Sequence, residues 1–293
     1  MPDFSAAASF RPLPSPTEVR STDDVTLAVY DLGGVGDDLL FVHATGFCAG
    51  VWAPVADHLD GNRLAALDVR GHGRSEVPAV GMAWEGTAQD VLATVDALGL
   101  ERPFGVGHSM GGASLVLAEQ ARPGTFRGLW LYEPIIFPSL DAFGPDPSDN
   151  PLSAGARRRR PTFESRAAAL ANYSSKPPFS ALDPASLAAY VEYGFEQLDD
   201  GSVTLRCRPE VEAQTYEMGP RHTASAHLGE VGCPVTVLRG HTDVPGPADL
   251  APVIAEMVPD GTLEEHPELG HFGPLEDPTR IAASIRDAVT AAP

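Results

Sequence analysis

Ser109 lies between two glycines in the stretch Gly107-His-Ser-Met-Gly111, which has the spacing G-x-S-x-G. A short, mostly apolar stretch over 102–106 precedes it, and mostly small residues over 113–121 follow. A serine at an abrupt turn from strand to helix is displayed beside the helix N-terminus, where backbone N–H groups favour negative charge. Glycines on either side let neighbouring backbone approach the turn. We expect Ser109 to be a nucleophile rather than an idle serine in a glycine-rich turn.

His271 is the histidine whose surroundings best suit a general base. A serine hydroxyl is a weak nucleophile until an imidazole accepts its proton, and histidine titrates near neutral pH. His271 follows the last expected strand, in a loop between Gly270 and Gly273 that can approach Ser109. A surface histidine is the alternative interpretation. Five other histidines have no local pattern and are expected to be solvated: His58, His222, His227, His241 and His266.

Strands and helices must position these residues, and their expected order is that of an α/β protein. Continuous apolar runs predict buried parallel strands, and apolar residues at helical spacing predict helices. Strand and helix alternate except over residues 136–228, where helices predominate. The expected strands cover residues 17–21, 26–31, 39–42, 63–68, 102–106, 126–132, 234–238 and 262–265. The expected helices cover residues 52–59, 84–98, 113–121, 163–173, 184–198, 209–218, 248–257 and 278–289.

Composition restricts the partners of the chain. The formal net charge of −20 over 293 residues disfavours nucleic acid and anionic membranes as partners. Three widely spaced cysteines without metal-ligand spacing indicate no metal site and reduced thiols in the cytoplasm. Residues 1–16 lack the basic start and apolar run of a signal peptide and predict an extended N-terminal arm. No apolar stretch is long enough to span a bilayer.

The chain resembles the α/β-hydrolase fold family in five motifs, which occur in that family's order. They are His43-Ala-Thr-Gly-Phe47, Asp68-Val-Arg-Gly-His-Gly-Arg-Ser75, Gly107-His-Ser-Met-Gly111, Gly240-His-Thr-Asp243 and Gly270-His-Phe-Gly-Pro274. The resemblance implies a mostly parallel, doubly wound sheet over 17–135 and 229–293. It also implies that residues 136–228 form a helical cap, inserted between two core strands, which covers the active site and sets substrate choice.

The resemblance implies a Ser-His-acid triad in which Ser109 is the nucleophile and His271 the base. Two positions suit the acid. Asp243 follows the strand at 234–238, the family's usual place, and is preferred; Glu133, at the end of the preceding strand, is the rival, because some relatives take the acid from there. Either carboxylate would hold the imidazole tautomer and stabilise the imidazolium.

The resemblance also implies an oxyanion hole from the N–H groups of Thr45 and Met110. Ala44 stands where the family commonly has glycine. His43, at the start of this loop, is expected to make a structural hydrogen bond, and His72 and His108 belong to structural turns. The expected substrate pocket includes Phe47, His108, Phe137, Tyr190 and Phe272. The run Arg157–Arg160 is expected to be solvated, with an anion site on the substrate as the alternative.

The predicted function is hydrolysis of a carboxylic ester or lactone of a small, largely apolar molecule through an acyl-enzyme. The alternatives on the same triad are a C–C bond hydrolase, an acyltransferase and a cofactor-free peroxidase. A non-catalytic ligand-binding relative is a further alternative, against which the intact Ser109 and His271 argue. We expect no cofactor, a small-molecule substrate, and neither nucleic-acid nor membrane partners; whether the chain forms a homo-oligomer stays open.

Overall fold

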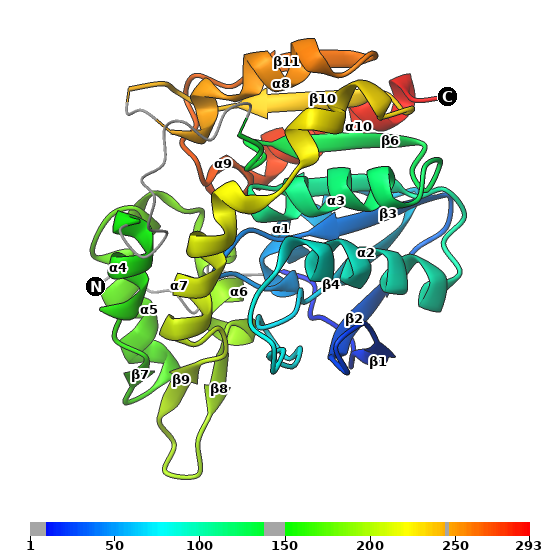
Figure 1. Ribbon diagram of the computed structural model, residues 1–293. Coiled ribbons are helices and arrows are strands. Elements are labelled where there is room, and N and C mark those ends of the chain that lie inside the picture. The colour runs from blue at the N-terminus through cyan, green and yellow to red at the C-terminus, as the bar shows by residue number, and fades with distance from the viewer. Residues whose placement is uncertain (1–9, 138–149, 244–245) are drawn as a thin grey trace.

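The computed structural model describes residues 10–137, 150–243 and 246–293. An eight-stranded sheet crosses the molecule in the order β1-β2-β4-β3-β5-β6-β10-β11, from β1 at the bottom to β11 at the top of Figure 1. The first three strands in this order pair antiparallel, and the others pair parallel. The strands are β1 (Thr17–Arg20), β2 (Thr26–Gly33), β3 (Asp37–Val42), β4 (Asn62–Leu67), β5 (Phe104–His108), β6 (Gly128–Tyr132), β10 (Val235–Arg239) and β11 (Gly261–Glu265).

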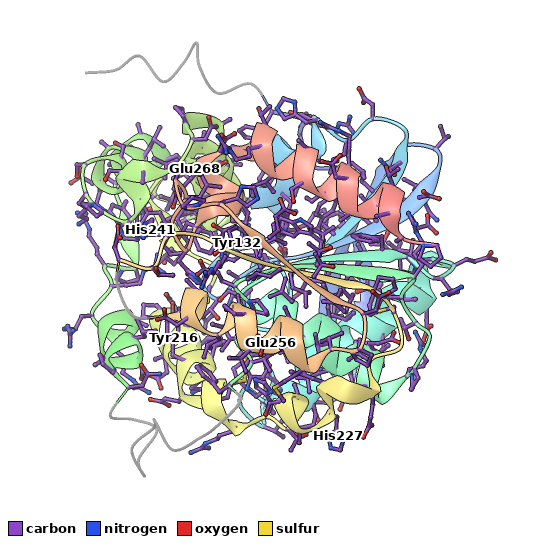
Figure 2. All side chains as sticks on the ribbon, turned by 90° about the horizontal axis from the view of Figure 1, so that it is seen from above. Tyr132, Tyr216, His227, His241, Glu256 and Glu268 are labelled. Atoms are coloured by element: carbon purple, nitrogen blue, oxygen red, sulfur yellow. The ribbon has the colours of Figure 1, made fainter. Side chains whose placement is uncertain are left out.

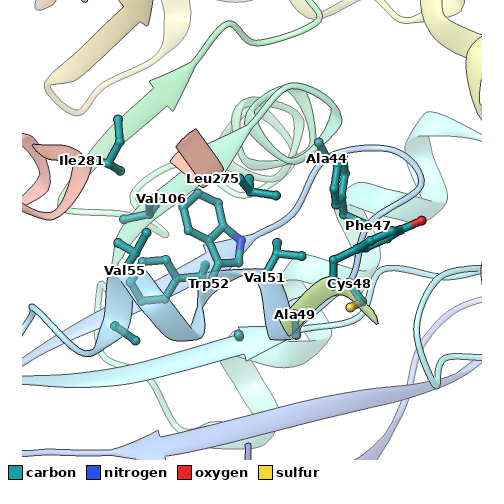
Figure 3. Close-up of a cluster of buried hydrophobic side chains, with 14 of the residues drawn as sticks. Ala44, Phe47, Cys48, Ala49, Val51, Trp52, Val55, Val106, Leu275 and Ile281 are labelled. Carbon is teal, nitrogen blue, oxygen red and sulfur yellow. The ribbon is translucent and has the colours of Figure 1, made fainter. Parts of the chain in front are cut away.

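The central strands are apolar on both faces because helices cover both sides of the sheet. Within β3, Leu39 and Phe41 join one buried cluster, whereas Leu40 and Val42 join the other, as alternation along a strand requires. One cluster surrounds the indole of Trp52, which lies 5.3 Å from the ring of Phe41 between centroids. Figure 3 shows Val51, Val55, Val106 and Ile281 around this indole. The doubly wound sheet predicted from the sequence is confirmed.

Helices α2, α3 and α8 contribute to the cluster on one face of the sheet, and α1 and α10 to the cluster on the other. Their bounds are η1 (Ala49–Trp52), α1 (Ala53–Ala56), α2 (Trp84–Leu98), α3 (Met110–Ala121), η6 (Pro247–Asp249), α8 (Ala251–Met257), α9 (Gly273–Glu276) and α10 (Pro278–Ala291). The predicted bounds of α2 are confirmed, and Gly99 ends it with a φ of 58°. The helix expected over 52–59 is instead a 3-10 turn followed by one short α-helix.

The segment between β6 and β10, described over 150–230 and called here the inserted segment, lies at the end of the sheet where the parallel strands terminate (Figure 1). Asp183 caps α6 by accepting hydrogen bonds from Ala185 N and Ser186 N, and Pro184 is its first residue, as predicted. The elements are α4 (Pro151–Arg157), β7 (Thr162–Phe163), α5 (Arg166–Ser174), η3 (Phe179–Ala181), α6 (Pro184–Tyr193), β8 (Phe195–Gln197), β9 (Val203–Leu205), α7 (Pro209–Met218), η4 (Gly219–Arg221) and η5 (Ala224–Glu230).

Two features of the inserted segment differ from expectation. The short strands β7, β8 and β9 form a three-stranded antiparallel sheet, where no strand was predicted. Strands of two or three residues are too short to show a period of two. The helix expected to run to 198 therefore ends at Tyr193, and the one expected from 163 begins at Arg166, after the Ser165 cap.

Two histidines expected to be solvated are buried, which is a correction. His222 donates from Nε2 to the carbonyl of Ile135 at 2.7 Å, and its ring lies edge-on to Trp84 at 4.6 Å. His266 is 8% exposed, and its Nε2 lies 2.8 Å from a carboxylate oxygen of Glu264. A lone histidine carries no periodic signal, so only packing distinguishes these positions.

The expected N-terminal arm is described only from Phe10 onward; residues 1–9 lie outside the described ranges. Residues 10–16 contain neither helix nor strand. The N–H of Leu13 donates to the hydroxyl of Tyr193 at 2.8 Å, so this stretch contacts the inserted segment. Within the three described ranges, no helix is both long enough and apolar enough to cross a bilayer.

Candidate active site

Ser109 occupies a backbone conformation that few residues adopt. It connects β5 to α3 with φ 55° and ψ −113°, and it is 5% exposed. Its N–H donates to the carbonyl of Tyr132 at 2.9 Å, and its carbonyl accepts from Ile135 N at 3.2 Å. These bonds to β6 and the residues after it hold the strained turn in place, as such turns require.

Gly107 and Gly111 permit the close packing that the turn demands. A Cβ on Gly111 would lie 2.1 Å from the carbonyl oxygen of Val42, and one on Gly107 would lie 2.7 Å from the backbone N of Gly112. The first turn of α3 therefore lies directly against the end of β3. Met110, the first residue of α3, thus starts its helix beside the loop 43–47 that contains Thr45.

His271 and Glu133 form the central contact of the site. Nδ1 of His271 lies 2.6 Å from Oε2 of Glu133, whose side chain is 2% exposed, and the other carboxylate oxygen accepts from Gly240 N at 2.8 Å. Because a carboxylate accepts at Nδ1, this nitrogen carries the proton and Nε2 is left to act as a base. Glu133 has a φ of 44°, another strained position at the end of a strand.

The loop that carries His271 is held by His108 and Tyr132, the residues that precede Ser109 and Glu133 in the sequence. His108 donates from Nε2 to the carbonyl of His271 at 2.8 Å, and the two imidazole rings lie 5.1 Å apart. The hydroxyl of Tyr132 donates to the carbonyl of Gly270 at 2.8 Å. Burial lowers the pKa of His108 well below its usual range, so the ring stays neutral. His108 thus anchors the histidine loop rather than lining an open pocket.

Asp243, preferred from the sequence, does not contact His271. Its side chain is 87% exposed, and its nearest ionic partner is Nδ1 of His241 at 3.7 Å. β10 ends at Arg239, and the N–H of Gly240 is bound by the Glu133 carboxylate. Figure 2 shows His241 and Tyr132 at the same end of the molecule. The preference for Asp243 is therefore corrected: the rival, Glu133, lies beside the imidazole.

Hydrogen bonds of the His43 side chain hold the loop 43–47 in place. Its Nδ1 donates to Ala44 O at 2.8 Å, and its Nε2 accepts from Val69 N at 3.1 Å, which is the structural hydrogen bonding expected of this residue. Burial lowers its pKa to about 4. Gly46 has a φ of 80°, and Phe47 N donates back to Ala44 O at 3.2 Å. Ala44, in place of glycine, fits this loop with 3% exposure.

Aromatic rings from the core and from the inserted segment meet above the histidine loop. The ring of Phe47 lies 5.4 Å from that of Phe272 and 5.2 Å from that of Tyr190. Phe179, not predicted from the sequence, lies 6.0 Å from Phe47 and 6.2 Å from Phe272. Phe179 is the first residue of the short 3-10 turn η3, which has no periodic pattern, so no local signal marks it. Phe137 is half-buried at the end of a described range, and its place in a pocket stays a prediction.

The arginine run is only partly solvated, which corrects a second expectation. Arg157 pairs with Glu210 and Glu217 near the surface. Arg159 instead turns inward: its guanidinium lies 2.5 Å from Glu212 and donates to the hydroxyl of Tyr190 at 2.7 Å.

This buried pair adjoins the loop 43–47. A Cβ on Gly46 would lie 3.0 Å from Oε1 of Glu212 and 3.4 Å from Nη1 of Arg159. Glu212 is 5% exposed, so its charge depends on the guanidinium for compensation. The inserted segment therefore supports the backbone next to Thr45 through one ion pair.

Within the described ranges, no three histidine, cysteine or acidic side chains are grouped so that they could hold a metal ion. The three cysteines, Cys48, Cys207 and Cys233, are unpaired and buried.

A strand-turn-helix serine, a histidine loop and a buried carboxylate at the ends of parallel strands define the α/β-hydrolase class. The chain belongs to the alpha/beta hydrolase family, whose family model matches residues 39–284. Members of this family are hydrolases.

Known proteins similar to this chain include enzymes with several chemistries. It is 27% identical over 277 residues to a non-heme chloroperoxidase of Streptomyces lividans, covering 86% of this chain and 91% of the relative. It is 31% identical over 173 residues to protein phosphatase methylesterase 1 of Mus musculus, covering 53% of this chain and 43% of that protein. The crystal structure of E-2-(acetamidomethylene)succinate hydrolase matches with a TM-score of 0.79 and 24% identity, covering 96% of this chain and all of that one (100%).

Proposed function

We propose that this protein is a serine hydrolase that cleaves an ester or lactone of a small, largely apolar molecule. The observation that carries the proposal is the 2.6 Å contact between Glu133 and Nδ1 of His271, on a loop bonded to the residue before Ser109. This contact leaves Nε2 available to accept the serine proton. The similarity to a methylesterase over 173 residues is consistent with an ester as substrate.

In the proposed reaction, Oγ of Ser109 attacks the carbonyl carbon while Nε2 of His271 takes the hydroxyl proton. The N–H groups of Met110 and Thr45 donate to the oxyanion, and removal of one such donor costs about 3 kcal/mol of barrier in comparable sites. His271 then gives the proton to the leaving alkoxide. Water attacks the acyl-enzyme with His271 as base, which releases the acid and restores Ser109. In this scheme Glu133 stays ionised and stabilises the imidazolium.

The proposed substrate class follows from the side chains above His271. Phe47, Phe179, Tyr190 and Phe272 present apolar rings, and the charge of Arg159 is compensated by Glu212. An uncharged acyl group suits such surroundings, because a charged one would lose its hydration without a partner. Two of these rings belong to the inserted segment, which supports the proposal that residues 136–228 act as a cap.

The test is labelling with a fluorophosphonate probe, followed by hydrolysis assays on p-nitrophenyl esters of increasing chain length and on lactones. Wild type should be labelled at a single residue, and Ser109→Ala should lose both labelling and turnover. Ser114→Ala is the matched control, because Ser114 lies on α3 with its hydroxyl bonded to Met110 O. Labelling that persists in Ser109→Ala would remove Ser109 from this role. A protein that binds such esters without labelling would be a non-catalytic relative.

A second candidate function is peroxidation, which the similarity to a non-heme chloroperoxidase over 86% of the chain favours. On the same triad, hydrogen peroxide would replace water in attacking the acyl-enzyme, giving a peracid and free Ser109. Peracid formation from acetate and peroxide, followed by bromide oxidation, distinguishes this activity from hydrolysis. Activity only with peroxide present would favour it.

A further inference from the structure

A cavity with a volume of 630 Å³ lies where the core meets the inserted segment. The core contributes residues 73–77 from the loop after β4, and the inserted segment contributes Pro161, Glu196 and residues 204–210. None of Ser109, His271 or Glu133 lines it. This volume is within the range typical of small-molecule sites.

Three arginines line this cavity: Arg74, Arg206 and Arg208. Within the described ranges no ion pair or side-chain hydrogen bond engages their guanidinium groups. By contrast, nearby Arg157 pairs with two glutamates and Arg159 with one. In a chain with net charge −20, three guanidinium groups without an ion pair at one cavity are a local concentration of positive charge.

The acidic side chains that line the cavity offset this charge only in part. Both carboxylate oxygens of Glu210 accept from Arg157, so its charge is already compensated. Glu76 accepts from the backbone N of Thr26 at 2.7 Å, which directs it toward β2. Glu196, exposed on β8, is the remaining acid of the lining. Glu76 keeps its negative charge, because a backbone N–H is a neutral donor, so three arginines without an ion pair face two acids without one, Glu76 and Glu196.

The start of α7 lines the cavity as well. Arg208 is the N-cap residue of this ten-residue helix, and no side chain caps its first turn, although Glu210 and Glu212 lie in that turn, each paired with an arginine. Pro209 and Glu210, the first two residues, line the cavity. Uncapped N–H groups and the helix dipole favour an anion at this position.

The backbone that carries two of these arginines is held in place before any ligand arrives. The N–H of Arg74 donates to the buried carboxylate of Asp68 at 2.8 Å, and a Cβ on Gly73 would lie 2.1 Å from the carboxyl carbon of Asp68. The N–H of Arg206 donates to Gly194 O at 3.0 Å. A fixed backbone lowers the cost of ordering the side chains when an anion binds.

We propose that this cavity binds a small polyanion, a molecule with two or more carboxylate or phosphate groups, at a site separate from Ser109. A planar guanidinium group can donate two parallel hydrogen bonds to the oxygens of either a carboxylate or a phosphate group. Binding involves no covalent step and does not depend on the proposed hydrolysis.

The experiment is isothermal titration calorimetry of the full chain with citrate, with pyrophosphate and with acetate at low and high salt. We expect one equivalent of citrate or pyrophosphate to bind, acetate to bind at least tenfold more weakly, and high salt to weaken the binding. Citrate alone would identify a polycarboxylate site, and pyrophosphate alone a phosphate site. Ser109→Ala should bind these anions as wild type does, so the binding result does not depend on whether Ser109 is the nucleophile.

Arg206→Gln and Arg208→Gln should each weaken binding about tenfold, which corresponds to about 1.4 kcal/mol. Arg158→Gln is the matched control, because Arg158 is exposed in the same segment and lies outside the cavity. Thermal unfolding of each variant verifies that it folds. Absence of one-to-one binding to either polyanion, or equal weakening by Arg158→Gln, would overturn the proposal.

Discussion

The carboxylate of Glu133 and Nδ1 of His271 meet at 2.6 Å although 138 positions separate them in the chain. Glu133 follows β6, while the loop that follows β10, the next strand in the sheet, carries the exposed Asp243. Adjacent parallel strands end at the same edge of the sheet, so two carboxylates are available near one histidine. Positive φ at Glu133 and the bond from Gly240 N direct its side chain toward the imidazole.

Glu133→Gln is expected to lower kcat by about three to four orders of magnitude, since an amide at Nδ1 favours the wrong imidazole tautomer. Asp243→Asn, which makes the same chemical change at an exposed residue, should leave kcat within about twofold of wild type. Steady-state kinetics on the best ester of the panel measures both. A large loss in Asp243→Asn with near-normal turnover in Glu133→Gln would reverse the assignment.

Arg159→Met is expected to destabilise the protein by about 3–5 kcal/mol, because it leaves the buried carboxylate of Glu212 without a partner. The double variant Arg159→Met/Glu212→Met should regain most of that stability, since it removes both charges. Urea unfolding monitored by circular dichroism measures the free energy of unfolding of each variant. A single variant as stable as wild type would show that Glu212 does not depend on Arg159.

The same pair of variants tests the support of loop 43–47. If Arg159 and Glu212 position this loop, the double variant should fold yet lose kcat with little change in KM, because the oxyanion role proposed for the Thr45 N–H is exerted in the transition state. Tyr190→Phe is the matched control: it removes one hydrogen bond to Arg159 and keeps the ion pair. Unchanged kcat in a folded double variant would contradict the positioning role.

His72→Gln is expected to make stability less dependent on acid pH. Burial, with the neighbouring His43 as the next cause, lowers the pKa of His72 to about 3. A depressed histidine pKa means that the unfolded chain binds protons that the native state does not, so stability falls as pH drops below the unfolded value of about 6.5.

For His72 this loss amounts to about 2 kcal/mol between about pH 6.5 and pH 4.5. Urea unfolding across this range should give a shallower decline in the variant, although His43 still contributes to both proteins. Parallel declines in wild type and variant would show that His72 titrates normally in the folded state.

The three thiols are expected to resist modification in the native protein. Burial raises the pKa of Cys48 and Cys207 above the usual range and that of Cys233 to about 12, so thiolate is scarce near neutral pH. Ellman's reagent at pH 8 (about half a unit below an ordinary thiol pKa) should react rapidly with none of the cysteines in the native protein. After denaturation it should react with all three. One rapidly reacting thiol in the native state would contradict this burial.

The order of the core elements could be predicted from the sequence because each depends on local signals. The apolar run of β3 and the Gly99 cap of α2 are each encoded within a few residues. The short strands β7, β8 and β9 could not be predicted, since a strand of two or three residues depends on partners distant in the sequence.

For the site, the sequence by itself determined that Ser109 stands on a strand-turn-helix and that His271 occupies a later loop, because glycine spacing and chain order are local properties. Only the tertiary structure placed Glu133 rather than Asp243 beside His271, turned Arg159 inward toward Glu212, and brought Phe179 close to Phe47. The physical reason is that side-chain direction at the end of a strand, and the burial of a charge, depend on contacts between segments that no local pattern records.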